Sequence, residues 1–173
     1  MTPSEPDEQL ELDLADAEKT ARAGGILAAL AHRGDVFALR GDLGAGKTTL
    51  ARGFISALVP TEEGVPSPTF TLVQTYPAEK DGEPVDIWHF DLYRLKQAEE
   101  AYEVGIEEAF AEGISLIEWP ERLGSLLPRH RLDVTLGPGT GPDSRRLRLA
   151  ARGNWVGRLA AVGAAIMGEL NRS

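Results

Sequence analysis

The most constraining feature of this chain is a glycine-rich segment placed between an apolar run and a helix-like run. Residues 36–40 are mostly apolar, Gly41 follows them, and after four intervening residues come Gly46, Lys47 and Thr48. Residues 50–58 then show the apolar spacing of a helix. This order predicts a strand, a loop and a helix, which is the setting that a phosphate-binding loop requires.

The residue types in this segment suit the binding of phosphate groups. Glycines let the backbone curl so that successive N–H groups point inward, and a helix N-terminus adds a positive dipole end aimed at the same place. In such a loop the lysine reaches the β- and γ-phosphates and the following hydroxyl binds Mg²⁺. We therefore expect Lys47 and Thr48 to take these roles in a nucleotide site.

Length and composition exclude several classes of protein. A chain of 173 residues suits one domain spanning 1–173, with residues 1–8 as a disordered lead. The absence of cysteine excludes disulfides, thiolate zinc sites and a cysteine nucleophile. No apolar run approaches the roughly 20 residues of a membrane span, and the acidic N-terminus is unlike a signal peptide. We expect a cytoplasmic protein.

Charge is distributed unevenly along the chain. The net charge of −9 argues against a general nucleic-acid binder, because neutralising phosphates needs clustered Lys and Arg. Residues 1–121 carry a balance of −15, whereas residues 122–173 carry +6. This asymmetry suggests surfaces for different partners, although solvation alone explains either half.

Periodicity along the chain predicts an α/β fold. Strands are predicted at 9–14, 36–40, 67–76 (broken at Pro77), 85–90, 113–117, 131–136 and 146–152, the last two as an antiparallel pair at a sheet edge. Helices are predicted from an Asp16 cap to His32, over 50–58, over 95–110 with a break at Gly105, and over 154–170. Asp81-Gly82 predicts a hairpin turn.

Two carboxylates follow predicted strands, at Asp91 and Glu118. The carboxyl end of a strand is where α/β nucleotide sites place Mg²⁺ ligands. The alternatives are a turn-capping aspartate and a surface glutamate. Thr69 fits a switch threonine that contacts Mg²⁺ or the γ-phosphate, or simply a strand former, and His89 fits a structural histidine better than a catalytic one.

Two charged clusters also have alternative interpretations. The glutamates between residues 99 and 108 fit a solvated helix face better than a docking face. Arg146, Arg148 and Arg152 alternate along the last strand, which favours protection of an exposed sheet edge over a patch that faces tRNA or a partner.

Four blocks of the sequence together resemble a known family. They are GDLGAGKTT at 41–49, SPTFTL at 67–72, HFDLYRL at 89–95 and IEWPE at 117–121. In this order they are similar to the bacterial TsaE (YjeE) family, the ATPase of tRNA threonylcarbamoyladenosine biosynthesis. The resemblance covers roughly residues 10–152.

The resemblance implies a P-loop NTPase-like three-layer sandwich with a mixed, mainly parallel central sheet and an antiparallel C-terminal edge. It implies binding of ATP and Mg²⁺, slow hydrolysis, and docking onto the TsaB–TsaD pair, with tRNA reached through that pair. From charge and hydropathy we expect neither DNA nor a membrane as a partner. By position, the implied catalytic residues are Lys47, Asp91, Glu118 and Thr69. The implied nucleotide-binding residues are Asp42, Gly44, Ala45, Gly46, Lys47, Thr48, Thr49 and Trp119, and the implied metal ligands are Thr48, Glu118 and Asp91.

Two other functions remain open at this point. A small-molecule kinase predicts an arginine-rich lid, and no such helix is evident between the loop and Asp91. A nucleotide-gated binding module predicts ATP binding without essential turnover. No arginine finger is obvious within the chain, although Arg94 and Arg52 are candidates, so isolated turnover is expected to be slow.

Overall fold

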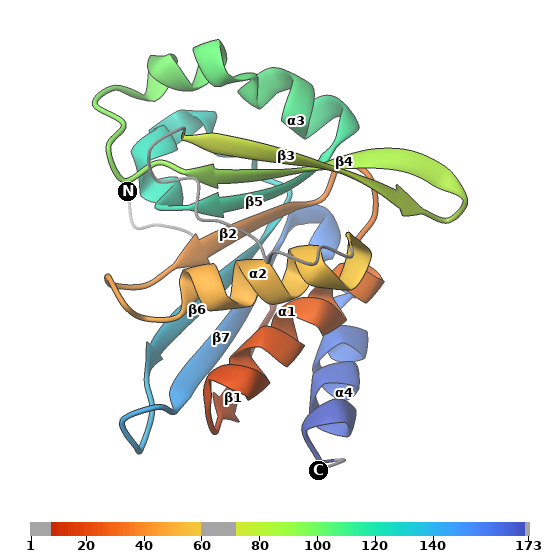
Figure 1. Ribbon diagram of the computed structural model, residues 1–173, viewed down its shortest axis with the longest axis vertical. Coiled ribbons are helices and arrows are strands. Elements are labelled where there is room, and N and C mark those ends of the chain that lie inside the picture. Colours follow the sequence, from red (N-terminus) through yellow and green to blue (C-terminus); the bar gives the residue numbers. More distant parts are fainter. Residues whose placement is uncertain (1–7, 60–71, 172–173) are drawn as a thin grey trace.

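The computed structural model describes residues 8–59 and 72–171, which form an α/β fold around one seven-stranded sheet (Figure 1). The strands are β1 (Glu8–Leu14), β2 (Val36–Arg40), β3 (Val73–Lys80), β4 (Glu83–Asp91), β5 (Ile114–Glu118), β6 (Arg131–Pro138) and β7 (Arg145–Arg152). The helices are α1 (Ala17–Leu30), α2 (Lys47–Leu58), α3 (Ile106–Glu112) and α4 (Leu159–Leu170), with 3₁₀ helices η1 (Ala98–Val104), η2 (Pro120–Leu126) and η3 (Gly153–Trp155). The described helices include none that is long and apolar enough to cross a membrane.

The sheet is mixed, with strand order β1-β7-β6-β2-β5-β4-β3. Parallel pairing joins the four central strands β6, β2, β5 and β4, whereas β1, β7 and β3 are added antiparallel at the two ends. The prediction of a mainly parallel sheet therefore holds only for the centre. The β6–β7 pair is confirmed, but its place at the edge is wrong, because β1 pairs along the whole of β7.

Helices cover the sheet from two sides. Helices α1, α2 and α4 pack on one face and enclose the larger hydrophobic core, in which the Phe37 ring makes edge contacts with Phe54 and Trp155 at 5.0 and 5.3 Å between centroids. The elements η1, α3 and η2 pack on the other face around Phe90 and Ile117. In Figure 1, α1 and α2 cross in front of the sheet and α3 lies beyond β3 and β4. Because α2 follows the glycine-rich loop, the packing of α2 on the sheet fixes the position of the loop.

Two local predictions at the β3–β4 hairpin have opposite outcomes. The prediction of a break at Pro77 is wrong, because Pro77 lies within β3 opposite Asp86. β3 is an edge strand, where a residue without an N–H is tolerated. The Asp81-Gly82 turn is confirmed, with φ of 55° and 81°, as a two-residue hairpin of the type with two left-handed residues. The start of the predicted strand at 67–76 lies outside the described residues.

The predicted helices are confirmed with changes at their ends. Asp16 caps α1 by accepting a hydrogen bond from the Lys19 N–H. The break at Gly105 is confirmed, since Gly105 has φ of 86°, but the segment before it is the 3₁₀ helix η1, not an α-helix. In the acidic segment around this break, Glu99, Glu103, Glu107 and Glu108 are exposed, which agrees with a solvated face.

The C-terminal helix begins later than predicted, at Leu159. Trp155 instead belongs to η3 and is buried in the core. Between them, Arg158 makes a two-pronged contact with Asp35, at 3.0 and 2.9 Å, and stacks over the Trp155 ring. This contact fastens the start of α4 to the turn before β2.

Candidate functional site

The glycine-rich loop between β2 and α2 needs glycine at its two motif positions. Gly41 has φ of 142°, and a Cβ added there would lie 2.5 Å from the Leu136 carbonyl oxygen. Gly46 has φ of 108° and is the residue that caps α2. A side chain at either position is therefore disfavoured by the backbone conformation, and at Gly41 also by the close approach of β6.

Lys47 is the first residue of α2 and is almost fully buried. Its ammonium group donates a hydrogen bond to the Gly41 carbonyl and lies 3.4 Å from the centroid of the Trp119 ring. Burial lowers the pKa of Lys47, and the negative charges of Glu118 and Glu121 act in the opposite direction. The positive charge is thus held inside the loop, between its backbone and an aromatic face.

The carboxyl ends of β4 and β5 bring Asp91 and Glu118 side by side, directly opposite each other in the parallel register. Glu118 is also opposite Leu39 near the end of β2, so both carboxylates meet the loop at the same sheet edge. The Thr48 hydroxyl donates to Glu118 Oε1 at 3.0 Å. Asp91 Oδ1 accepts from the Tyr93 N–H at 3.1 Å. Asp91 and Glu118 are both buried residues.

These groups line one pocket of about 310 Å³ in front of the N-terminus of α2. Its lining consists of Leu43, Gly44, Ala45, Gly46, Lys47, Thr48, Thr49, Asp91, Tyr93, Glu118, Trp119 and Arg145. A positive helix end, a buried ammonium group and two carboxylates therefore share one concave site. Such a site suits a polyanion that carries a cation.

The oxygen donors in this pocket fit Mg²⁺ better than a metal held by protein alone. Three residues with hydroxyl groups (Thr48, Thr49 and Tyr93) and two with carboxylates line the pocket, and no cluster of three or more His, Asp or Glu side chains forms a metal centre within residues 8–59 and 72–171. Mg²⁺ is usually bound by one or two carboxylates together with water and phosphate oxygens. The donor set fits a metal that arrives with a phosphate ligand.

Comparison with known proteins identifies the family. The family model described as "Threonylcarbamoyl adenosine biosynthesis protein TsaE" matches residues 14–147. The chain belongs to the TsaE family. A tRNA threonylcarbamoyladenosine biosynthesis protein TsaE from Bacillus subtilis (strain 168) is 37% identical over 147 residues, which cover 84% of this chain and 88% of that protein. One from Rickettsia conorii is 42% identical over 123 residues, covering 71% and 68%. The crystal structure of B. subtilis YdiB superposes with a TM-score of 0.69 at 31% identity, covering 94% of this chain and 96% of that one.

The structure brings most of the residues implied by the TsaE resemblance into one place. All of Gly44 to Thr49 line the pocket, together with Asp91, Glu118 and Trp119. Asp42 does not line it and instead faces a neighbouring depression between the loop and β6. Thr69 lies outside the described residues. The roles of these residues stay predictions, and their spatial grouping is what the structure adds.

Trp119 has a backbone conformation that is unusual for its type. Its φ of 61° and ψ of 51° place it in the left-handed region, directly after Glu118 and before Pro120. Its ring lies over the Lys47 ammonium group and 5.0 Å from the Tyr93 ring. A left-handed aromatic residue is a strained residue of the kind that gathers at functional sites.

Sequence analysis did not single out two residues of this site, Arg145 and Tyr93, and it interpreted a third, His89, as structural. Arg145 donates to the Ala45 carbonyl at 2.9 Å and to the Gly44 carbonyl at 3.3 Å, and so holds the loop from behind. Tyr93 lines the pocket, and His89 contacts Glu118. Arg145 is the first residue of β7, which runs antiparallel to β6. The start of β7 therefore lies at the same end of the strands as the loop, and only the strand order reveals this. The sequence-derived candidates Arg94 and Arg52 are not among the residues that line the pocket.

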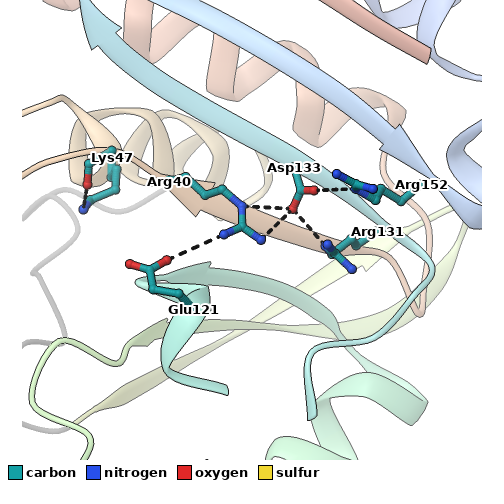
Figure 2. Close-up of polar contacts among 7 residues, drawn as sticks. Arg40, Lys47, Glu121, Arg131, Asp133 and Arg152 are labelled. Carbon is teal, nitrogen blue, oxygen red and sulfur yellow. Dashed lines mark hydrogen bonds and ion pairs between the residues drawn. The ribbon is translucent and has the colours of Figure 1, made fainter. Parts of the chain in front are cut away.

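A second polar cluster lies near the loop, on the sheet face opposite to α1 and α2 (Figure 2). Asp133 on β6 is buried and accepts hydrogen bonds from Arg40, Arg131 and Arg152 at 3.2, 2.9 and 3.0 Å. Arg40, the residue before Gly41, also reaches toward Glu121 at 3.7 Å. The cluster therefore ties the end of β2 to η2, the segment that follows Trp119.

The sequence suggested that the arginines of β7 protect an exposed sheet edge. In the structure they do not. Arg146 and Arg148 both donate to Glu11 on β1 at 3.0 Å, and Arg152 donates to Asp133. β1 is the edge strand, so these side chains join neighbouring strands across one sheet face. The earlier interpretation was wrong because it took β7 for the last strand of the sheet.

Proposed function

We propose that this protein is a Mg²⁺-dependent ATPase with a P-loop NTPase-like fold that supports threonylcarbamoylation of tRNA. It acts on the TsaB–TsaD pair in the cytoplasm and reaches tRNA through that pair. One observation carries the ATPase proposal: Lys47, Thr48, Asp91 and Glu118 come from three separate segments and line one pocket at the N-terminus of α2. Family membership carries the link to tRNA modification.

Each side chain has a distinct role in this proposal. The N–H groups of the loop and of the first turn of α2 bind the phosphates, and Lys47 places its charge against the β- and γ-phosphate oxygens. Thr48 and Glu118 hold Mg²⁺, and Asp91 holds the metal or a water bound to it. The metal would supply positive charge that offsets the negative charge developing on the phosphate oxygens during hydrolysis. Thr69 acts as a switch contact to the γ-phosphate, and Trp119 flanks the nucleotide.

The expectation that the isolated chain turns over slowly is supported by Arg145, the one arginine among the described residues that lines the pocket. Arg145 already donates to two loop carbonyls and to the carbonyls of Pro142 and Ser144, so its guanidinium supports the loop and is not extended toward a γ-phosphate. An arginine finger stabilises the transition-state charge and raises turnover by about 10³- to 10⁵-fold in other phosphate-transferring systems. We therefore propose that the partner pair completes the site and accelerates hydrolysis.

The direct experiment measures ATP hydrolysis with and without the purified TsaB–TsaD pair. We expect slow Mg²⁺-dependent hydrolysis alone, stimulation by the pair, and loss of both in Lys47→Ala. Lys96→Ala is the matched control, because Lys96 is exposed and does not line the pocket. A full hydrolysis rate in Lys47→Ala would contradict the assignment of the site.

Two alternatives give different results in related assays. A small-molecule kinase transfers the γ-phosphate to an acceptor, which a screen of phosphate acceptors would detect. A nucleotide-gated binding module needs no turnover, so Glu118→Ala would bind ATP and still support tRNA modification. The proposal expects no acceptor to be phosphorylated and expects Glu118→Ala to be defective.

A further inference from the structure

His89 is a fully buried residue of β4 that shares a sheet face with Asp91, two residues later. Across the parallel pairing it lies opposite Leu116 of β5. The next residue of β5 on the same face, toward the carboxyl edge, is Glu118. The imidazole therefore stands one position behind the two carboxylates, on the interior side of the site.

The imidazole contacts the carboxylate of Glu118 directly. His89 Nε2 lies 2.7 Å from Glu118 Oε2, and the exposed fractions of the two side chains are 0% and 3%. The other oxygen, Oε1, accepts the hydrogen bond from Thr48 at 3.0 Å. Glu118 is thus held at both oxygens, one from the interior by His89 and one at the pocket by Thr48.

Only one of the two ring nitrogens of His89 has a hydrogen-bond partner within the described residues. An ionised carboxylate only accepts, so we assign the proton to Nε2. The other ring nitrogen, Nδ1, has no hydrogen-bond partner among the residues that the structure describes. Buried side-chain nitrogens are usually paired, so a histidine retained for packing alone is expected to satisfy both. Within the described part of the chain, the one hydrogen bond of the His89 imidazole is the one to Glu118.

We propose that His89 is a positioning residue that fixes the rotamer of Glu118, so that Oε1 stays beside Thr48 at the metal position. This inference rests on the proposed function, since it assigns Glu118 to Mg²⁺. Groups that orient a metal ligand from behind commonly change metal affinity by about 10- to 100-fold when they are removed. His89 is not among the residues that line the pocket, so we expect nucleotide binding without metal not to depend on it.

Two substitutions of similar polarity separate positioning from packing. His89→Gln puts an amide nitrogen close to the place of Nε2, whereas the shorter His89→Asn places its amide near Nδ1 and cannot reach Glu118. Ser115→Ala is the control for a buried change in the same sheet, because Ser115 is fully buried and its hydroxyl has no hydrogen-bond partner within the described part of the chain. The readouts are the Mg²⁺ concentration for half-maximal ATP hydrolysis and the affinity for ADP without Mg²⁺.

We expect His89→Asn to raise the half-maximal Mg²⁺ concentration by about 10-fold or more, and His89→Gln and Ser115→Ala to stay near the wild type. ADP affinity without metal is expected to be the same in all four proteins. An unchanged Mg²⁺ requirement in His89→Asn overturns the inference, and so does a defect in His89→Gln as large as that in His89→Asn. A wild type that lacks Mg²⁺-dependent hydrolysis instead overturns the proposed function.

A measurement on the folded wild type covers the case in which His89→Asn does not fold. Nitrogen-15 NMR of the histidines distinguishes a proton on Nε2 from one on Nδ1. We expect His89 to carry it on Nε2, with a proton shift typical of a strong hydrogen bond that Glu118→Gln moves. A proton on Nδ1, or a signal that is unaffected by Glu118→Gln, contradicts the inference.

Discussion

Helices α1 and α2 cross with Gly24 of α1 packed directly against the backbone of α2. Substitution of this glycine tests how the packing of α2 supports the loop. A Cβ added to Gly24 would lie 2.0 Å from the Leu50 carbonyl oxygen and 2.9 Å from the Phe54 nitrogen. The neighbouring Gly25 differs, since its Cβ would lie 3.7 Å from the nearest atoms, Ala57 Cβ and a backbone oxygen. The same change, Gly to Ala, is therefore expected to have opposite effects at adjacent positions of one helix.

The expected magnitudes follow from two terms. Alanine is favoured over glycine inside a helix by about 1 kcal/mol at both positions. At Gly24 the methyl group meets backbone atoms that cannot rotate away, so the helices must separate, and overpacking of this kind costs about 3 kcal/mol at the upper end of its usual range. We expect Gly24→Ala to lose about 2 kcal/mol of unfolding free energy and Gly25→Ala to gain up to about 1 kcal/mol.

Urea unfolding at neutral pH measures both changes, and thermal unfolding gives an independent reading. For a domain of this size 1 kcal/mol corresponds to about 2–4 °C, so the two variants should differ in melting temperature by about 6–12 °C. Because α2 begins at Lys47, we also expect weaker ATP binding in Gly24→Ala than in Gly25→Ala. Equal stability of the two variants would refute the reasoning, as would a loss at Gly25 as large as that at Gly24.

Two further predictions concern the ion pairs of Asp133 on β6 and of Asp35 in the turn before β2. Burial raises the pKa of Asp133, but the hydrogen bond from Arg131 and the charge of Arg40 lower it by more, so it lies below its ordinary value. Its contribution is therefore complete above the unfolded pKa of about 4 and is lost as the pH falls further. We expect Asp133→Asn to lose about 2–4 kcal/mol in urea unfolding at pH 7 and the deficit to shrink below about pH 4; a deficit independent of pH would contradict this. Arg158→Ala removes the two hydrogen bonds to Asp35 and should speed hydrogen exchange in α4 without changing exchange in β5, whereas uniform acceleration would show that the contact is not local.

The elements that sequence analysis predicted correctly are those whose signals are local. The alternation of polar and apolar residues predicted β1, and the Asp81-Gly82 turn predicted the β3–β4 hairpin. The glycine spacing predicted the loop with its strand and helix. Pro77 misled the prediction because a proline is tolerated on an edge strand, and nothing local shows that β3 is an edge. The same lack of strand order placed β7 at an edge that β1 occupies.

The residues of the candidate site also fall into those that local sequence signals reveal and those that they do not. Lys47, Thr48, Asp91 and Glu118 could be found because each stands at a recognisable end of a strand or start of a helix. Arg145 could not, because its nearness to the loop depends on the pairing of β6 with β7. The role inferred for His89 depends on the register of β4 against β5, which brings it behind Glu118. Long-range pairing, not residue type, decides these contacts.

We propose that a nucleotide held by the loop brings its metal to the carboxylates of β4 and β5. A crystal structure with a non-hydrolysable ATP analogue and Mn²⁺, whose anomalous signal locates the metal, tests it most directly. We predict the γ-phosphate against Lys47 and the Mn²⁺ peak beside the Thr48 hydroxyl, on the side that faces Glu118 and Asp91. A nucleotide bound elsewhere, or a metal peak remote from Thr48 and Glu118, would contradict the account.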